Sequence, residues 1–224
     1  NYAKSLQHTQ QEKGNFQAAK IWLDQAFHFF RNSLPQEYDF TEQLEMLYLL
    51  GQVYQLTSER DQALTYYQQG LQIAERYENR LFQVKALEGL ASLSSKEQAE
   101  PYYQKALSLV QTVNDPMLTA TLYKSLGQYH SELGQYQQAF SYLEQAIKLS
   151  EEKHYQILQA EIYEVLGYGK LKMGLQDVAE VLFLKSKVIY EQEKSLNGLA
   201  SIYNLLGACC FYKQELEKAE HHFL

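Results

Sequence analysis

The sequence predicts an all-α fold, a solenoid of antiparallel helix hairpins, and three observations support this prediction. Only 3 Pro and 11 Gly occur among 224 residues, so few positions interrupt a helix. Apolar residues recur at spacings of three and four, as in Leu122, Leu126, Tyr129 and Leu133, which gives a helix one buried stripe. A Leu-Gly pair also returns at regular intervals, which indicates that one helical unit is repeated along the chain.

Composition excludes several classes of protein. The formal charge is −7 and the pI is near 5.4, so the chain lacks the excess of positive charge that is typical of a nucleic-acid binder. Hydrophobic residues make up 46% of the chain, which argues against global disorder, but no apolar run is long enough to span a membrane. The chain opens without Met or an apolar leader. The adjacent Cys209 and Cys210 do not form a disulfide framework, so we expect a cytoplasmic location and burial of both thiols.

The repeat is defined by one glycine and one alanine in each unit. The Leu-Gly glycines are Gly51, Gly127, Gly167 and Gly207, with Ala91 in their place in one unit. Twelve residues later stand Ala63, Ala139, Ala179 and Ala219, but Ala99 follows Ala91 by only eight. Four residues after the alanines stand Tyr67, Tyr103, Leu143, Phe183 and Phe223. We therefore expect close helix contacts at the glycines and alanines, and a turn four residues shorter in the unit of Ala91.

This pattern resembles the tetratricopeptide repeat, in which W-x-x-L-G-x-x-Y is followed by A-x-x-x-F. With a half-match from Gly14 to Ala26, the resemblance covers nearly the whole chain and implies a right-handed superhelix of six hairpins. The units of this single domain, 1–224, would be 1–36, 38–78, 80–114, 116–153, 155–193 and an incomplete 196–224. The period is mostly 40 rather than 34, which resembles the repeats of kinesin light chains and of bacterial peptide-sensing regulators. Because the pattern stops within its last unit, we expect a fragment of a longer protein.

The periodicity places helices at definite positions. We expect them at 2–13, 15–32, 38–57, 60–78, 80–94, 97–113, 116–133, 136–152, 155–173, 176–193, 196–213 and 216–224. Gly134 and Gly174 suit left-handed helix ends, and Pro116 suits a first helical position. Gln135 and Asp177 lie near the starts of second helices, where a polar or acidic cap stabilises the helix. Pro101 predicts either a late helix start near Glu100 or a distorted first turn.

The chain carries no recognisable catalytic or metal-binding motif. It has no G-x-S-x-G, no H-E-x-x-H and no phosphate loop, and Gly167-Tyr168-Gly169 lacks the third glycine of a dinucleotide site. His221 and His222 point in different directions on a helix and have no second ligand pair. We therefore expect no enzyme activity, no catalytic residue, no metal and no cofactor.

The resemblance implies a binding surface on the concave face, which the first helix of each hairpin lines in this family. The peptide-binding candidates are Tyr48, Gln52, Lys85, Glu88, Lys124, Gln128, Glu161, Glu164, Tyr168 and Asn204. The two tyrosines are expected anchors, and the charges suggest a ligand with opposite charges at its two ends. The family's clamp for a chaperone carboxylate is not matched, because His8 follows Lys4 where Asn is expected.

The predicted function is that of a non-catalytic protein–protein interaction scaffold, which binds a peptide or helical segment of a partner in its concave groove. One alternative is a peptide-sensing regulatory module of a larger bacterial regulator. Another is a helical appendage of an enzyme whose catalytic domain lies elsewhere, since the fold does not choose among these. The expected partner is a protein or peptide, not nucleic acid or a membrane. Self-association through the C-terminal end is expected because residues 215–224 lack a covering neighbour.

Overall fold

The computed structural model describes residues 20–22, 25, 28 and 40–215. Nine α-helices lie within 40–215, joined by short turns; residues 20–22, 25 and 28 are also helical, and no strand occurs among the described residues. The chain divides into two compact units, residues 1–114 and 115–224. The helices expected at 2–13 and 216–224, and most of the one at 15–32, lie outside the described residues, as do Lys4, His8, His221 and His222.

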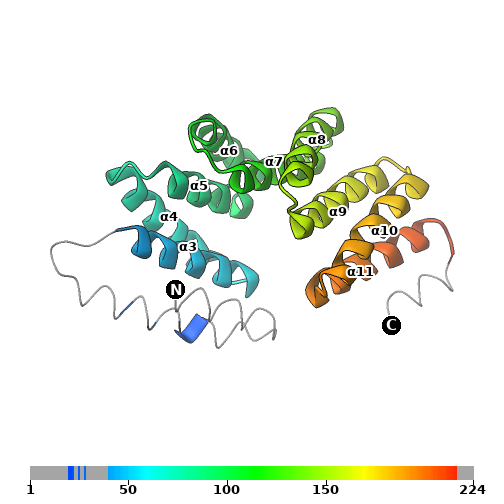
Figure 1. Ribbon diagram of the computed structural model, residues 1–224, viewed down its shortest axis with the longest axis horizontal. Helices are drawn as coiled ribbons and strands as arrows, with labels where there is room; N and C mark the ends of the chain where they lie inside the picture. The colour runs from blue at the N-terminus through cyan, green and yellow to red at the C-terminus, as the bar shows by residue number, and fades with distance from the viewer. Residues whose placement is uncertain (1–19, 23–24, 26–27, 29–39, 216–224) are drawn as a thin grey trace. The chain divides into compact units, whose positions relative to one another are not determined.

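From residue 40 onward, the described part of the first unit contains two antiparallel helix hairpins (Figure 1). Its helices are α3 (Phe40–Leu56), α4 (Arg60–Arg76), α5 (Arg80–Leu93) and α6 (Lys96–Val110). Contacts join α3 to α4 and α5 to α6 within the hairpins, and α4 to α5 and α3 to α5 between them. The first helices of neighbouring hairpins therefore pack directly on one another.

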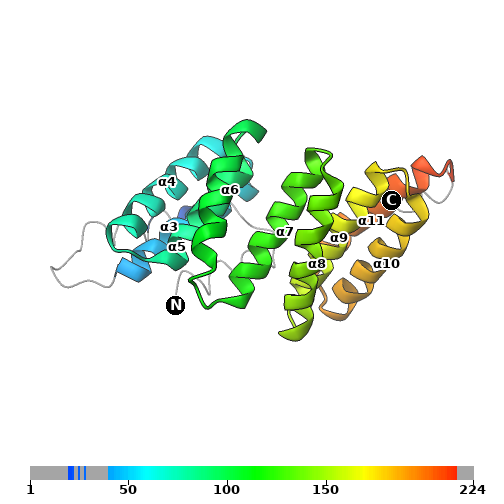
Figure 2. The same cartoon turned by 90° about the horizontal axis from the view of Figure 1, so that it is seen from above.

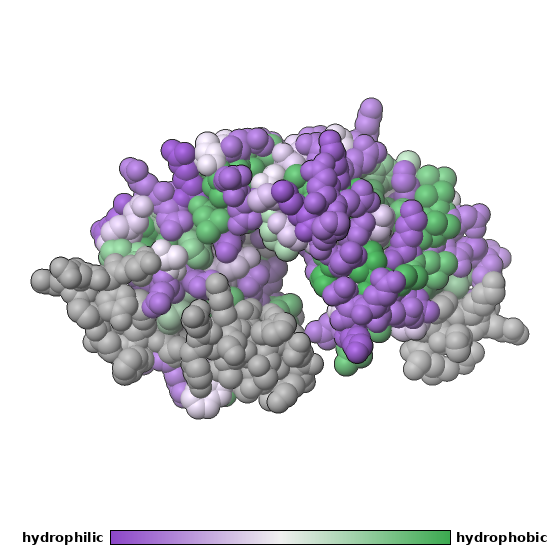
Figure 3. Space-filling model, viewed as in Figure 1, coloured by the Kyte–Doolittle hydropathy of each residue, from purple (hydrophilic) through white to green (hydrophobic). Residues whose placement is uncertain are grey.

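The described part of the second unit, 115–215, contains two hairpins of the same kind and a further first helix (Figure 2). Its helices are α7 (Pro116–Glu132), α8 (Tyr136–Glu152), α9 (Gln156–Lys172), α10 (Gln176–Gln192) and α11 (Leu196–Tyr212). The first helices contact each other again, α7 with α9 and α9 with α11. On the face drawn in Figure 3, apolar side chains gather along α10. The all-α fold of stacked hairpins is confirmed.

The close helix contact expected at each Leu-Gly glycine is present. The side chain that fills the space belongs to the residue four positions after the repeat alanine. A Cβ added to the glycine would lie 2.4 or 2.5 Å from that side chain in three pairs: Gly51 with Tyr67, Gly127 with Leu143, and Gly167 with Phe183. The alanines Ala63, Ala139 and Ala179 are fully buried. Glycine on the first helix thus makes room for a large side chain from the second helix. This contact packs the two helices of a hairpin closely together.

Seven turns share one backbone feature, a single residue in the left-handed region, which the turns at 94–95 and 111–115 lack. Gly134 and Gly174 adopt it with φ of +75° and +76°, as expected. In five other turns a residue with a side chain takes the same conformation: Ser58, Glu78, His154, Lys194 and Gln214. Side chains in this region cost free energy, so the tertiary fold, and not local preference, holds these five turns.

The hairpin of α5 and α6 is shorter, but not in the way expected. The two residues between its helices replace the usual three, and α5 has 14 residues where the other first helices have 17. Most of the deletion therefore falls in the end of α5. The side chain of Arg60 donates from Nε to the carbonyl of Leu93 at 2.7 Å, which satisfies an acceptor at the shortened end.

Two expectations about helix starts need correction. The helix α6 begins at Lys96, so the late start near Glu100 is wrong, and Pro101 lies inside the helix. Gln135 occupies the N-cap position of α8 but its side chain does not bond to that helix. Its Oε1 instead lies 2.7 Å from Nδ1 of the buried His130. By contrast, Asp115 does cap α7 by accepting from the backbone N–H of Leu118, with Pro116 at the first position.

Candidate functional site

The first helices of neighbouring hairpins contact each other through side chains that are 37 residues apart in sequence. In the first unit these pairs are Tyr48 with Lys85 and Gln55 with Ser92. In the second unit they are Lys124 with Glu161 and Glu164 with Ser201. Within each unit, the constant spacing shows that neighbouring first helices lie side by side in one register. We call the surface that carries these side chains in each unit the first-helix face. The paired residues include five of the predicted binding residues, Tyr48, Lys85, Lys124, Glu161 and Glu164. The other five follow a paired residue by three or four positions and so lie on the same side of their helices: Gln52, Glu88, Gln128, Tyr168 and Asn204.

In the first unit the structure brings four predicted residues together. Gln52 donates from Nε2 to the hydroxyl of Tyr48 at 3.0 Å. The ammonium of Lys85 lies 5.1 Å from the centre of the Tyr48 ring, a cation–π contact. Burial raises the pKa of Tyr48 above its ordinary value, and the charge of Glu88 raises it further. Tyr48 is therefore a neutral, largely covered residue, and its ring is held in place before any ligand arrives.

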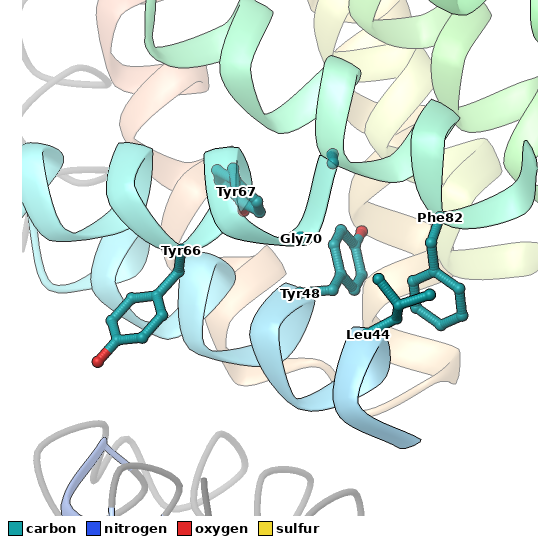
Figure 4. Close-up of a pocket in the computed structure, with 7 residues that line it drawn as sticks. Leu44, Tyr48, Tyr66, Tyr67, Gly70 and Phe82 are labelled. Carbon is teal, nitrogen blue, oxygen red and sulfur yellow. The ribbon is translucent and has the colours of Figure 1, made fainter. Parts of the chain in front are cut away.

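A small cavity lies beneath Tyr48, between α3, α4 and α5 (Figure 4). It is lined by Leu44, Tyr48, Tyr66, Tyr67, Gly70, Phe82 and Ala86. Its volume of about 10 Å³ has room for about one water molecule, so it cannot hold a ligand side chain as it stands. Figure 4 shows Leu44 and Tyr48 beside Phe82, while Tyr66 points away from them. The cavity is a packing defect next to the site and not a binding pocket.

In the second unit, Lys124 on α7 forms an ion pair with Glu161 on α9. Both side chains are partly exposed, so the pair contributes little to stability, about 0–1 kcal/mol. The ion pair matters instead because it reduces the net charge that the first-helix face presents to a ligand. Lys124 and Glu161 were expected to attract opposite ends of a ligand, but in the folded chain each neutralises the other.

Glu164 has a different environment one turn further along α9. Its Oε2 accepts a hydrogen bond from the hydroxyl of Ser201 on α11 at 3.0 Å. Burial raises the pKa of Glu164, and the nearby hydroxyls of Tyr190 and Ser201 oppose this rise. Burial and the nearby Glu164 also raise the pKa of Tyr190. The carboxyl, the phenol and the serine therefore form one polar cluster that links α9, α10 and α11.

Tyr190 reaches this cluster because the residue that it packs against, Gly198, has no side chain. Compared with the first unit, the large and small residues of this pair are exchanged. At the equivalent junction in the first unit, the large Phe82 packs with the small Ala74, eight residues earlier. At the last junction the sizes are reversed, since Tyr190 is large and Gly198 is small. A Cβ on Gly198 would lie 2.4 Å from the Tyr190 ring. The absence of a side chain at Gly198 is what admits the ring.

Three of the predicted residues lie on exposed parts of the second unit. Gln128 donates to Glu132 on its own helix at 3.1 Å. Tyr168 is 37% exposed, and the ammonium of Lys172 lies 5.1 Å from the centre of its ring. Asn204 is exposed on α11. These side chains are accessible to a partner, and a ligand role for all ten predicted residues stays a prediction.

Sequence reasoning missed two residues that organise the face. Gln55 accepts from the hydroxyl of Tyr67 at 2.9 Å and donates to Ser92 at 3.3 Å, which ties a second helix to two first helices. Tyr190 belongs to a second helix, whereas the binding candidates were chosen only from first helices. Its signal was available in the sequence, because the residues 40 and 116 positions earlier, Ser150 and Ala74, are small.

The cysteines are buried as expected, and Cys209 donates from Sγ to the carbonyl of Gln176 at 3.3 Å. Burial raises the pKa of Cys209 to about 11, so it is an unreactive thiol at neutral pH. Among the residues that the structure describes, no three His, Cys, Asp or Glu side chains are grouped to hold a metal ion. None of the described helices has the length and apolar character needed to cross a membrane.

The fold and this face define a helical repeat protein, and the comparisons with known families support one type. Residues 46–81 and residues 93–152 each match a model of the tetratricopeptide repeat. The matches support a tetratricopeptide repeat protein and indicate a protein–protein interaction scaffold. No curated protein sequence matches the chain significantly.

Several solved structures share the fold. A thermophilic TPR protein of Thermus thermophilus is 22% identical with a TM-score of 0.63, over 92% of this chain and 97% of that one. A Rap protein complexed with Competence and Sporulation Factor is 19% identical with a TM-score of 0.72, over 97% of this chain and 71% of that one. Aspartyl phosphate phosphatase F from Bacillus subtilis is 15% identical with a TM-score of 0.72, over 98% of this chain and 56% of that one. At these identities the likeness concerns the fold alone.

Proposed function

We propose that this protein is a non-catalytic scaffold that binds a peptide or helical segment of a partner protein on its first-helix face. The observation that carries the proposal is the constant 37-residue spacing of contacts between neighbouring first helices. Such a register places polar and aromatic side chains of successive helices next to one another, as an extended ligand requires. Tyr168, Gln128 and Asn204 are accessible on this face and can contact a ligand without prior rearrangement.

The ligand we propose binds mainly through backbone hydrogen bonds and one aromatic contact. The pairing of Lys124 with Glu161 balances the charge of the second unit's face, which weakens the case for a ligand with oppositely charged ends. Gln128 and Asn204 can each donate to and accept from a peptide backbone. Tyr168 offers a large contact area with few rotatable bonds, which suits an anchor residue.

A second candidate is a peptide-sensing regulatory module of a larger bacterial regulator. It is supported by the likeness in fold to a Rap protein that was solved in complex with Competence and Sporulation Factor. The helical appendage of an enzyme remains the third alternative, and no observation favours it. We further propose a single repeat domain with the six units given above, a 40-residue-period subtype and a cytoplasmic location.

The experiment that tests the first-helix face begins with a ligand selected from a library of random peptides on the wild-type chain. Binding of the selected peptide is then measured by fluorescence anisotropy for two double variants. The first combines Tyr168→Ala with Asn204→Ala, which removes two exposed side chains of the face. We expect it to weaken binding by more than about tenfold, or roughly 1.4 kcal/mol, without lowering the melting temperature.

The matched control combines Gln137→Ala with Gln138→Ala, two exposed residues on α8, a second helix. This variant should bind as the wild type does. Equal binding by both double variants would contradict the proposal and move the search to other surfaces. Loss of binding only in the first variant would support the first-helix face.

A further inference from the structure

The outward face of α10 is unusually apolar. Val178, Val181, Leu184 and Val188 follow one another at spacings of three and four, and so lie along one stripe of the helix. Each of these four side chains is between 44% and 56% exposed. The apolar surface along α10 in Figure 3 agrees with this pattern. We call these four residues the α10 stripe.

The repeat itself does not require apolar residues at these positions. The equivalent exposed residues on α8, 40 positions earlier, are Gln138, Ser141, Glu144 and Lys148. On α4, 116 positions earlier, they are Gln62, Thr65, Gln68 and Gln72. Because two related helices carry polar residues here and remain folded, the stripe does not serve packing within the unit. A contiguous exposed apolar patch on a folded domain marks an interaction surface.

Two residues of the stripe and two charged residues beside it are arranged symmetrically about Val181. Val178 and Leu184 stand three positions to either side of it, and Asp177 and Lys185 stand four positions to either side. If a second α10 crosses antiparallel with the two Val181 side chains in contact, each Val178 comes level with the Leu184 of the other copy. Each Asp177 likewise comes level with the Lys185 of the other copy. The face therefore matches apolar positions to apolar positions and opposite charges to each other, as an isologous interface requires.

The ends of the stripe fit the same arrangement. Val188 is seven positions after Val181, and Gly174 is seven positions before it. A Cβ at Gly174 would meet nothing within 4 Å, so the turn leaves open space for the Val188 of the other copy. The neighbouring Met173 and Leu175 are exposed and would supply apolar contacts to that side chain. Asp177 already pairs with Lys213 at 2.9 Å, but its side chain is 90% exposed and remains open to a second cation.

From these observations we propose that the α10 stripe is a homodimer interface, in which two copies of this chain pair through antiparallel α10 helices centred on Val181. This surface is formed by a second helix and is separate from the first-helix face, so it extends the proposed function. The expected self-association through residues 215–224 concerns residues that lie, except for Glu215, outside the described part of the chain.

The first test measures the mass of the full chain by sedimentation equilibrium over a range of concentrations. The wild type should show a concentration-dependent dimer. Val181→Glu places two carboxylates at the centre of the interface, and should raise the dissociation constant by at least about tenfold. Ser141→Glu, at the equivalent exposed position of α8, should dimerise as the wild type does. Because both positions are exposed, the melting temperatures of the dilute variants should be unchanged.

The second test uses engineered cysteines to determine which positions of the two α10 helices lie opposite each other in the dimer. Val181→Cys should form a disulfide-linked dimer under mild air oxidation, because the two introduced thiols meet on the symmetry axis. Val188→Cys should not, because the two copies would be separated by 14 residues of helix, about 21 Å. Ser141→Cys is the control for random collision. The native Cys209 and Cys210 are at most 1% exposed and should not interfere.

Each outcome decides the question. A monomer at every concentration, or a dimer that tolerates Val181→Glu, would overturn the proposal. Equal cross-linking by the Val181→Cys and Ser141→Cys variants would overturn it as well, and would instead favour a different protein as the occupant of the stripe. Selective cross-linking at position 181 together with loss of the dimer in Val181→Glu would establish the interface. None of these results depends on whether the first-helix face binds a peptide.

Discussion

Leu143 fills the space that a side chain on Gly127 would need: a Cβ added to Gly127 would lie 2.4 Å from Cγ of Leu143. Gly127 is inside α7, five residues before its end, and Leu143 is in the middle of α8, so this contact sets how closely the two helices of the hairpin approach. Both residues are buried, and Leu143 is completely inaccessible to solvent.

Replacing this glycine with a large residue should therefore be severe. We expect Gly127→Leu to lower the free energy of unfolding by about 2–4 kcal/mol, because the added side chain overfills a close-packed contact. Thermal unfolding followed by circular dichroism measures the effect. A melting temperature within about a degree of the wild type would show that the hairpin can separate without cost.

Gly70 should behave in the opposite way. It is also in the interior of a helix, but a Cβ there would meet only Cβ of Leu47, at an ordinary 3.7 Å. Gly70→Ala should raise the free energy of unfolding by up to about 1 kcal/mol, because alanine has the higher helix propensity and occupies part of the cavity. Chemical denaturation of the two proteins side by side provides the measurement. Destabilisation by Gly70→Ala would mean that the cavity wall cannot accept a methyl group.

The size swap at the last junction can be tested by exchanging the large and small residues. Gly198→Leu alone should destabilise the chain by about 1–3 kcal/mol, because the new side chain overlaps the Tyr190 ring. Combining it with Tyr190→Ser restores the Ser150 and Leu158 sizes found one repeat earlier, and should recover much of that loss. A double-mutant cycle measures the coupling, which we expect to be about 1–3 kcal/mol. Additive effects of the two substitutions would show that the residues do not compensate for each other.

A strained turn offers a stabilising substitution. His154 has a φ of 57°, a conformation that glycine adopts freely and side chains do not. We expect His154→Gly to stabilise the chain by about 1 kcal/mol. The converse substitution, Gly174→Ala, should destabilise it by a similar amount although nothing lies within 4 Å of the new methyl group. Thermal unfolding of both variants checks the pair, and a shift in the same direction for both would refute the strain argument.

The stability of the second unit should respond to the ionisation of Glu164. Burial raises its folded pKa above the unfolded value, so the favourable contribution of this carboxyl is complete below the unfolded pKa. That contribution is lost as the pH rises through the folded pKa. Glu164→Gln stays neutral, and should be more stable than the wild type at neutral pH by a margin that shrinks toward acid pH.

Melting temperatures measured across a pH series check this expectation. The matched control is Glu161→Gln, which removes the ion pair with Lys124 and should not stabilise the chain at neutral pH. A margin for Glu164→Gln that grew toward acid pH would contradict the sign of the shift.

The sequence determined the helices and their order, because these depend on local periodicity and on a pattern that recurs. Spacing of apolar residues placed α7 at 116–133, and the structure has Pro116–Glu132. Gly134 and Gly174 were identifiable as left-handed turn residues, since glycine is the residue that adopts this conformation without strain. His154 and Lys194 in the same conformation were not identifiable, because there the packing of the flanking helices overrides the local preference.

The sequence also determined one part of the candidate site, and the tertiary structure decided the rest. The sequence placed Lys124, Glu161 and Glu164 on one face, since the repeat fixes which positions of a first helix point in the same direction. Only the tertiary structure decided that Lys124 and Glu161 neutralise each other while Glu164 is paired with Ser201 and Tyr190. A repeat pattern sets direction along a helix, but the charge state of a face depends on distances between helices. Those distances are set by the sizes of the residues at the contacts, such as Gly198 against Tyr190.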